Sequence, residues 1–171
     1  TKGEISMHRL VRGAAFAAFT LSLAASPVVA QQALFRLTSQ GQGPGLSLDV
    51  GDVPGIQRHI AMMLPTAQPS GQYWEIKGSR GGDVRLSNQW SGSNQCLDVD
   101  QSGALYMDQC GQQFGQRWQI REVAGQGVQL TNTFKPGHCL DVVAGTLRTL
   151  AALVPCSGAP SQLWTVSLTG R

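Results

Sequence analysis

The sequence is poor in charged, aromatic and histidine residues. Of its 171 residues, 13% are charged, 6% are aromatic and three are histidines. Lys and Arg form no run or patch that could neutralise a row of phosphates, which argues against nucleic acid as a partner. No cluster of His and Cys has the spacing of a metal site, so we predict neither a metal nor a cofactor. The two histidines beyond residue 30, His59 and His138, share no motif, and we predict that the chain is not an enzyme.

A long apolar run is also missing. The apolar run near the N-terminus, Gly13 to Ala25, has 13 residues, whereas a membrane-spanning helix needs roughly 20. It follows Met7 and a basic stretch, and it precedes small residues that suit cleavage before Gln31, which is the layout of a secretory signal peptide. We therefore predict a secreted or periplasmic protein with three parts: an unassigned extension (1–6), a signal peptide (7–30) and one mature domain (31–171).

What the sequence does contain is a threefold repeat. Three copies of Gln-x-Trp end at Trp74, Trp118 and Trp164, which are 44 and 46 residues apart. A Leu-Asp-Val segment lies upstream of each copy. A fixed period of this kind indicates one supersecondary unit repeated three times, in which no unit can bury its apolar face alone. The predicted repeats cover about residues 33–78, 79–124 and 125–171.

The four cysteines occupy two positions of this repeat. Cys96 and Cys110 stand in the second repeat where Cys139 and Cys156 stand in the third, and the first repeat lacks both. Paired loss is what a bridge predicts, because independent thiols would be lost separately. An exported protein also favours disulfides over metal sites. We therefore predict the bridges Cys96–Cys110 and Cys139–Cys156.

Each repeat contains four short apolar or alternating runs. In the second repeat they cover residues 84–87, 97–99, 104–110 and 118–121, with Gly, Ser and Asn in the turns between them. Short strands at regular spacing predict an all-β barrel or sandwich, here of twelve strands. Leu105 and Met107 alternate with Tyr106 and Asp108, so we expect Tyr106 and Asp108 on the outer face and the tryptophans in the core.

Cys-Leu-Asp-Val followed by Gln-x-Trp, three times in register, resembles the ricin B-type lectin family. The resemblance covers nearly all of Leu34 to Ser167 and implies a β-trefoil, an all-β fold of three four-stranded repeats with pseudo-threefold symmetry, and carbohydrate as the partner. In that family the Asp accepts hydrogen bonds from sugar hydroxyls. An aromatic residue two positions before the second cysteine stacks on the sugar, and an Asn just before Gln-x-Trp supplies an amide.

The match to these site elements is partial. The ring position holds Leu64, Asp108 and Val154, and the Asn position holds Gly71, Gly115 and Ser161. All three aspartates and glutamines are present. The candidate carbohydrate-binding residues are Asp98, Tyr106, Asp108 and Gln116 in the second repeat, Asp141 and Gln162 in the third, and Asp49 and Gln72 in the first. The alternative is that the aspartates are structural turn residues.

The second repeat is the best candidate, because it pairs an outward ring, Tyr106, with Asp98 on an adjoining strand. Trp90 and Phe134 lie at equivalent turns and are further candidate rings, although we expect both to close the end of the barrel. Residues 98–103 match the opening of a calcium loop, but the twelfth position is Gln109 rather than Glu, and a hairpin turn explains the same residues.

We therefore predict an exported, non-catalytic carbohydrate-binding module that binds glycosides weakly. The alternative is a β-trefoil module that binds or inhibits another protein and has degenerate sugar sites. The repeat favours the first reading, and the missing rings and amides favour the second.

Overall fold

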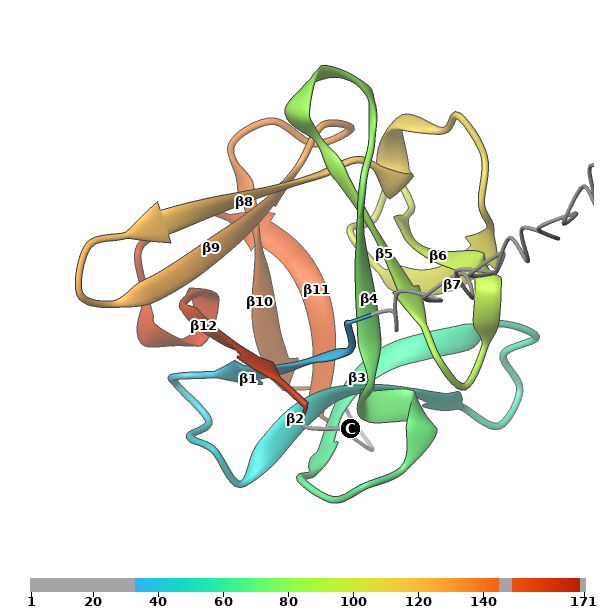
Figure 1. The fold of residues 1–171 in the computed structure, drawn as a ribbon, viewed down its shortest axis with the longest axis horizontal. Coiled ribbons are helices and arrows are strands. Elements are labelled where there is room, and N and C mark those ends of the chain that lie inside the picture. The colour runs from blue at the N-terminus through green and yellow to red at the C-terminus, as the bar shows by residue number, and fades with distance from the viewer. Residues whose placement is uncertain (1–32, 145–148, 170–171) are drawn as a thin grey trace, which may run out of the picture. The chain divides into compact units, whose positions relative to one another are not determined.

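The structure, a computed structural model, describes residues 33–144 and 149–169. They form twelve β-strands and four 3-10 turns (Figure 1). The strands are β1 (Phe35–Ser39), β2 (Leu46–Asp52), β3 (His59–Pro65), β4 (Trp74–Gly78), β5 (Val84–Asn88), β6 (Gly92–Val99), β7 (Leu105–Gln109), β8 (Trp118–Val123), β9 (Gly127–Asn132), β10 (His138–Ala144), β11 (Thr149–Pro155) and β12 (Trp164–Leu168). The predicted all-β class is confirmed. The predicted extension and signal peptide lie outside the described residues.

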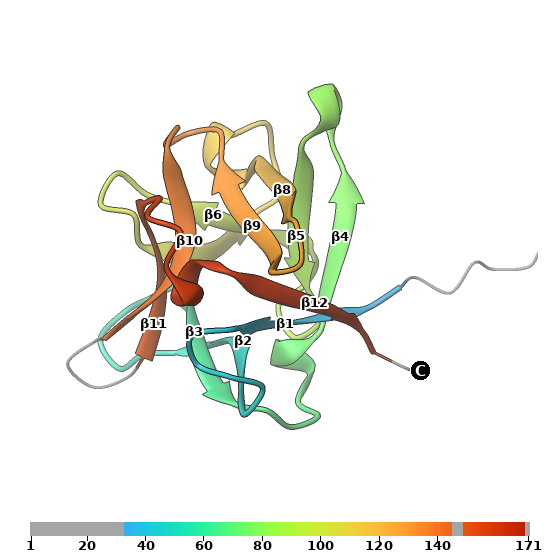
Figure 2. The same cartoon turned by 90° about the vertical axis from the view of Figure 1, so that its left-hand side faces the viewer.

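Six of the strands close into a barrel. β1 pairs with β4, β4 with β5, β5 with β8, β8 with β9, β9 with β12, and β12 with β1. The other six form the hairpins β2–β3, β6–β7 and β10–β11, which lie together on one side of the barrel (Figure 2). β3 is bridged to both β7 and β11. Closure of this kind pairs strand edges that would otherwise be exposed.

The tryptophans of the Gln-x-Trp motifs join the two layers. Each begins a barrel strand, and all three are completely buried. Each indole Nε1 donates to the carbonyl of the leucine in its own repeat's Leu-Asp-Val segment, over 3.0, 2.9 and 3.0 Å for the pairs Trp74–Leu48, Trp118–Leu97 and Trp164–Leu140. A large apolar ring thereby enters the core without an unsatisfied donor. The inward packing predicted for the tryptophans is confirmed.

The second and third repeats contain the two predicted disulfides, Cys96–Cys110 and Cys139–Cys156. At the same place in the first repeat, the hydroxyls of Ser47 and Thr66 lie 2.7 Å apart and form a hydrogen bond. The first repeat therefore keeps the cross-link of the other two as a hydrogen bond.

Candidate functional site

The three aspartates of the Leu-Asp-Val segments are buried, with exposed fractions of 3%, 5% and 8% for Asp49, Asp98 and Asp141. In each of them Oδ1 accepts a hydrogen bond from the backbone N–H of the following valine, over 2.6–2.7 Å. In the second and third repeats Oδ2 also accepts from the glutamine of Gln-x-Trp, over 3.0 Å from Gln116 and 2.9 Å from Gln162. Both oxygens of these two carboxylates are therefore held in fixed directions.

The glutamines of Gln-x-Trp lie below the surface and connect the carboxylates to the backbone. The Gln116 side chain accepts from the N–H of Gly111 over 2.8 Å and donates to the carbonyl of Gln109 over 2.9 Å. Gln72 and Gln162 make the equivalent backbone bonds, and all three are at most 1% exposed. Gln72, Gln116 and Gln162 therefore hold the aspartates and the adjoining turns in place, and their predicted contact with a ligand stays a prediction.

In the first two repeats the residue before Gln-x-Trp is a glycine that lies against the carboxylate, whereas the third repeat has Ser161 there. An ideal Cβ on Gly71 would lie 2.0 Å from Asp49 Oδ1, and one on Gly115 would lie 2.1 Å from Asp98 Oδ1. A side chain at either place would displace the carboxylate. In the third repeat Asp141 makes the same bonds beside Ser161, so the close approach of the glycine is a feature of the first two repeats.

Burial raises the pKa of both Asp49 and Asp98 above the usual value for aspartate, because it disfavours the charged form. For Asp98 the hydrogen bonds from Gln116 and the backbone of Val99 act in the opposite direction, the charge of Asp108 raises the pKa further, and the charge of Arg58 lowers it. The effects of Asp108 and Arg58 show that one negative and one positive group lie close to the Asp98 carboxylate.

The residue that faces each aspartate across its hairpin distinguishes the repeats. Asp49 pairs with Met62, Asp98 with Tyr106 and Asp141 with Ala152. Of the three, the second repeat alone therefore places a ring beside the carboxylate. As predicted, Tyr106 and Asp108 lie on the outer side of β7, while Leu105 and Met107 are buried.

Arg58, which the sequence analysis missed, completes this group. Its guanidinium carbon lies 4.4 Å from the centroid of the Tyr106 ring, a cation–π contact. Burial, and after it the charge of Asp98, raises the pKa of Tyr106 above the ordinary value, so its hydroxyl is a donor at neutral pH. Arg58 comes from the loop of the preceding repeat, and no motif marks it. The site therefore combines an acceptor, a ring and a cation.

Trp90 and Phe134 do not close the barrel, and that prediction is wrong. They are 44% and 42% exposed. The backbone of each is bound by the asparagine two residues earlier. Asn88 accepts from Trp90 N over 3.0 Å, and Asn132 accepts from Phe134 N over 2.9 Å. The side-chain amides of these asparagines also donate to the carbonyls of the glycines that precede Gln-x-Trp.

The segment that resembles a calcium loop forms a hairpin turn. Asp100 Oδ1 accepts hydrogen bonds from the backbone N–H groups of Ser102 and Ala104, over 2.8 and 3.1 Å. Asp98 accepts a hydrogen bond from Gln116 instead. Within residues 33–144 and 149–169, no group of three His, Cys, Asp or Glu side chains is arranged to hold a metal ion.

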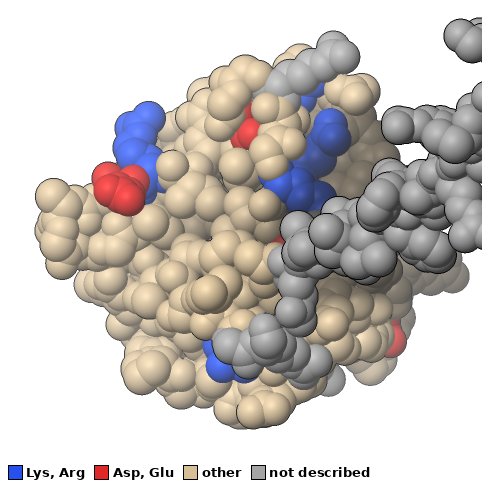
Figure 3. Space-filling model, viewed as in Figure 1, with Lys and Arg blue, Asp and Glu red and all other residues tan. Residues whose placement is uncertain are grey.

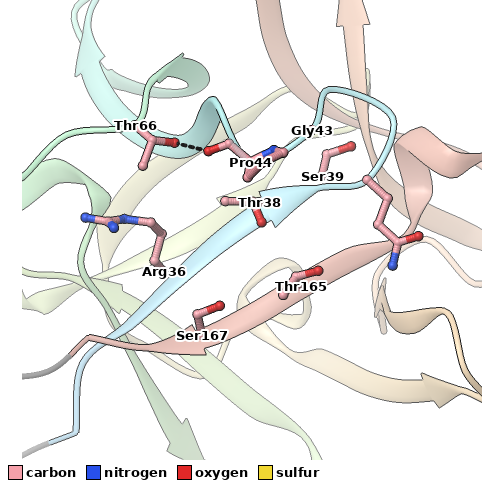
Figure 4. A pocket seen from close by; sticks show the side chains of 9 residues that line it. Arg36, Thr38, Ser39, Gly43, Pro44, Thr66, Thr165 and Ser167 are labelled. Atoms are coloured by element: carbon pink, nitrogen blue, oxygen red, sulfur yellow. Dashed lines mark hydrogen bonds between the residues drawn. The ribbon is translucent and has the colours of Figure 1, made fainter.

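A separate open pocket of about 510 Å³ lies on the outer face of β1 and β12 (Figure 4). The pocket has room because β12, which the third repeat contributes, has short side chains on its outer face. Thr38 faces Thr165 and Arg36 faces Ser167, whereas the equivalent places of β4 hold the longer Glu75 and Lys77. The pocket is lined by Arg36, Thr38, Ser39, Gln40, Gly43, Pro44, Thr66, Thr165 and Ser167. None of the three repeat aspartates lines it.

Charge is spread thinly over the surface. On the face shown in Figure 3, Lys and Arg lie in small separate groups and uncharged residues cover most of the area. No helix in the described part of the chain is long and apolar enough to cross a membrane.

Residues 35–164 match the family described as the ricin-type beta-trefoil lectin domain. A search of curated proteins gives no match. Among solved structures, the chain is similar to ThreeFoil, a designed threefold-symmetric protein, with a TM-score of 0.66 and 20% identity over 78% of this chain and 97% of that one.

Two larger proteins contain a similar fold. An exo-beta-1,3-galactanase from Clostridium thermocellum matches with a TM-score of 0.70 and 18% identity over 81% of this chain. A mosquitocidal holotoxin matches with a TM-score of 0.71 and 14% identity over 83% of this chain. The matches cover 31% of the galactanase and 18% of the holotoxin, so this chain corresponds to one part of each. At these identities the likeness concerns the fold.

Proposed function

Because the chain belongs to the ricin-type beta-trefoil lectin family, we propose that it is a non-catalytic carbohydrate-binding module whose principal site surrounds Asp98 of the second repeat. The observation that supports this choice most is the position of Tyr106 directly across the hairpin from the fixed Asp98 carboxylate, with Arg58 on its ring. An ionised carboxylate accepts hydrogen bonds from two sugar hydroxyls, and a guanidinium donates to their oxygens.

Each residue has a separate role in this proposal. Asp98 accepts hydroxyl hydrogen bonds through the lone pairs that Gln116 and Val99 leave free. Tyr106 offers the part of its ring that Arg58 leaves open, together with its hydroxyl. Asp108, exposed on the same side of the strand, borders the site.

The affinity should be low. The site is shallow, the carboxylate is largely buried, and the family's stacking ring and amide are absent from their usual positions. We expect a dissociation constant in the millimolar range, about 4 kcal/mol of binding free energy. Binding this weak becomes useful when several sites or several copies engage one polysaccharide.

Calorimetric titration with galactosides, xylo-oligosaccharides and mannosides tests the function, and three variants test the site. Asp98→Ala and Tyr106→Ala should lose binding. Asp98→Ala and Asp141→Ala should both lower the thermal midpoint, because each removes the carboxylate bonds to a valine N–H and a glutamine amide, so binding is compared at a temperature well below the midpoint of every variant. Asp141→Ala is the matched control: Asp141 has the same bonds to valine and glutamine but faces Ala152. Equal loss in all three variants would refute the choice of the second repeat. Absence of binding to every glycan would favour a protein-interaction module.

Export is part of the same proposal. The two disulfides fit an oxidising compartment, which is where such bonds persist. We propose that residues 31–171 form the mature domain after removal of residues 7–30.

A further inference from the structure

Three equivalent turns follow β1, β5 and β9, and two of them present an exposed ring. The last residue of each strand is polar: Ser39, Asn88 or Asn132. Two residues later the chain has Gly41, Trp90 or Phe134, respectively. All four tryptophans of the protein lie in the described residues; three are completely buried, and Trp90 is 44% exposed. An indole this exposed lacks apolar burial that would have stabilised the fold.

The Trp90 turn is fixed on both sides. Asn88 accepts from the N–H of Trp90 over 3.0 Å and donates to the carbonyl of Gly71 over 2.7 Å. The N–H of Gln89 donates to the carbonyl of Tyr73 over 2.9 Å. The ring is therefore carried on backbone that is bound to the Gln-x-Trp turn of the first repeat. A platform already fixed in this way loses little conformational entropy when a ligand stacks on it.

A polar side chain of the first repeat, His59, contacts the indole. The His59 ring lies 4.7 Å from it, centroid to centroid, at an interplanar angle of 75°. His59 Nδ1 in turn lies 2.8 Å from Asp52 Oδ1, and both of these side chains are exposed. A near-perpendicular contact leaves much of the indole open, and it sets a hydrogen-bonding pair at its border.

We propose that Trp90, His59 and Asp52 form a second saccharide site, in which the C–H face of a neutral pyranose stacks on the indole and its hydroxyls bond to His59 and Asp52. This inference rests on the proposed carbohydrate-binding function. The ring comes from the second repeat and the polar pair from the first, so the site spans a repeat boundary. Arg58 and His59 are adjacent in the chain, and each contacts the ring of a different site.

Fluorescence tests the proposal directly, because Trp90 is the one tryptophan of the four that an aqueous quencher reaches. Methyl β-galactoside, xylotriose and methyl α-mannoside are titrated into the full protein while emission and iodide quenching are recorded. The sugar that binds should change the emission and protect it from iodide. Trp90→Ala should weaken its calorimetric affinity about tenfold, which corresponds to 1.4 kcal/mol, and His59→Ala should weaken it to a smaller extent.

Phe134→Ala is the matched control. Phe134 occupies the same turn with nearly the same exposure, and within the described residues it has no ring partner like His59. Its replacement should leave the affinity unchanged. If a sugar binds by calorimetry but neither emission nor the Trp90→Ala affinity changes, the second site is refuted and the Asp98 site stands. Equal weakening by Trp90→Ala and Phe134→Ala also refutes it. Absence of calorimetric binding to all three sugars refutes both this site and the carbohydrate function.

Discussion

Replacing Gln116 with alanine tests whether the Gln-x-Trp glutamine holds the carboxylate and the turn together. The substitution removes the hydrogen bonds to Asp98 Oδ2, the Gly111 N–H and the Gln109 carbonyl, at 3.0, 2.8 and 2.9 Å. Each buried polar group left without a partner costs about 1–3 kcal/mol. Water can reach part of this turn once the side chain is shortened, so we expect about 3 kcal/mol of lost unfolding free energy rather than the full sum.

Urea unfolding measures this loss, and thermal unfolding gives a second estimate. For a domain of this size 1 kcal/mol corresponds to a few degrees, so the thermal midpoint should fall by about 10 °C. Gln112→Ala, at an exposed residue in the same turn, is the control and should change stability by less than about 0.5 kcal/mol. A loss below about 1 kcal/mol for Gln116→Ala would show that the glutamine is not a structural support.

Three further outcomes are expected. Sugar affinity should fall as the pH drops through the raised pKa of Asp98, at a pH above the usual aspartate range, because the ionised carboxylate is the form that accepts two hydroxyls. Calorimetry at a series of pH values measures this fall, and constant affinity across the series would contradict the prediction. Ser47→Cys with Thr66→Cys should form a third disulfide and add about 3 kcal/mol of stability; free thiols in the oxidised variant would show that the equivalence of the repeats fails here. Secreted protein should begin at Gln31 on N-terminal sequencing, and membrane-bound protein with residues 7–30 intact would refute cleavage.

Much of the fold could be predicted because its determinants repeat in the sequence. The spacing of Trp74, Trp118 and Trp164 sets the number of units, and the alternation around Tyr106 correctly predicts which side of β7 faces outward. Paired presence and absence of cysteines predicts the bridges, since both partners occupy fixed places in the unit. These features depend on neighbours within one repeat, and periodicity records them directly.

The candidate site could be predicted only in part, because its contacts cross from one repeat to the next. Arg58 reaches Tyr106 from the preceding repeat, and His59 meets Trp90 in the same way. Neither pair has a fixed spacing that a motif could reveal. The sequence predicts that Trp90 closes the barrel end, but in the structure Trp90 is 44% exposed on a turn that Asn88 binds.

The sequence by itself determined the threefold β-trefoil, the disulfide pairs and the family, because each is encoded by local spacing repeated three times. The tertiary structure decided the direction of the carboxylates and the identity of the exposed rings. Gln116 holds the Asp98 carboxylate in its buried position, and Gly115 packs beside it without a side chain. These outcomes depend on which side chains compete for the same space after the chain has folded, and no pattern along the chain contains that information.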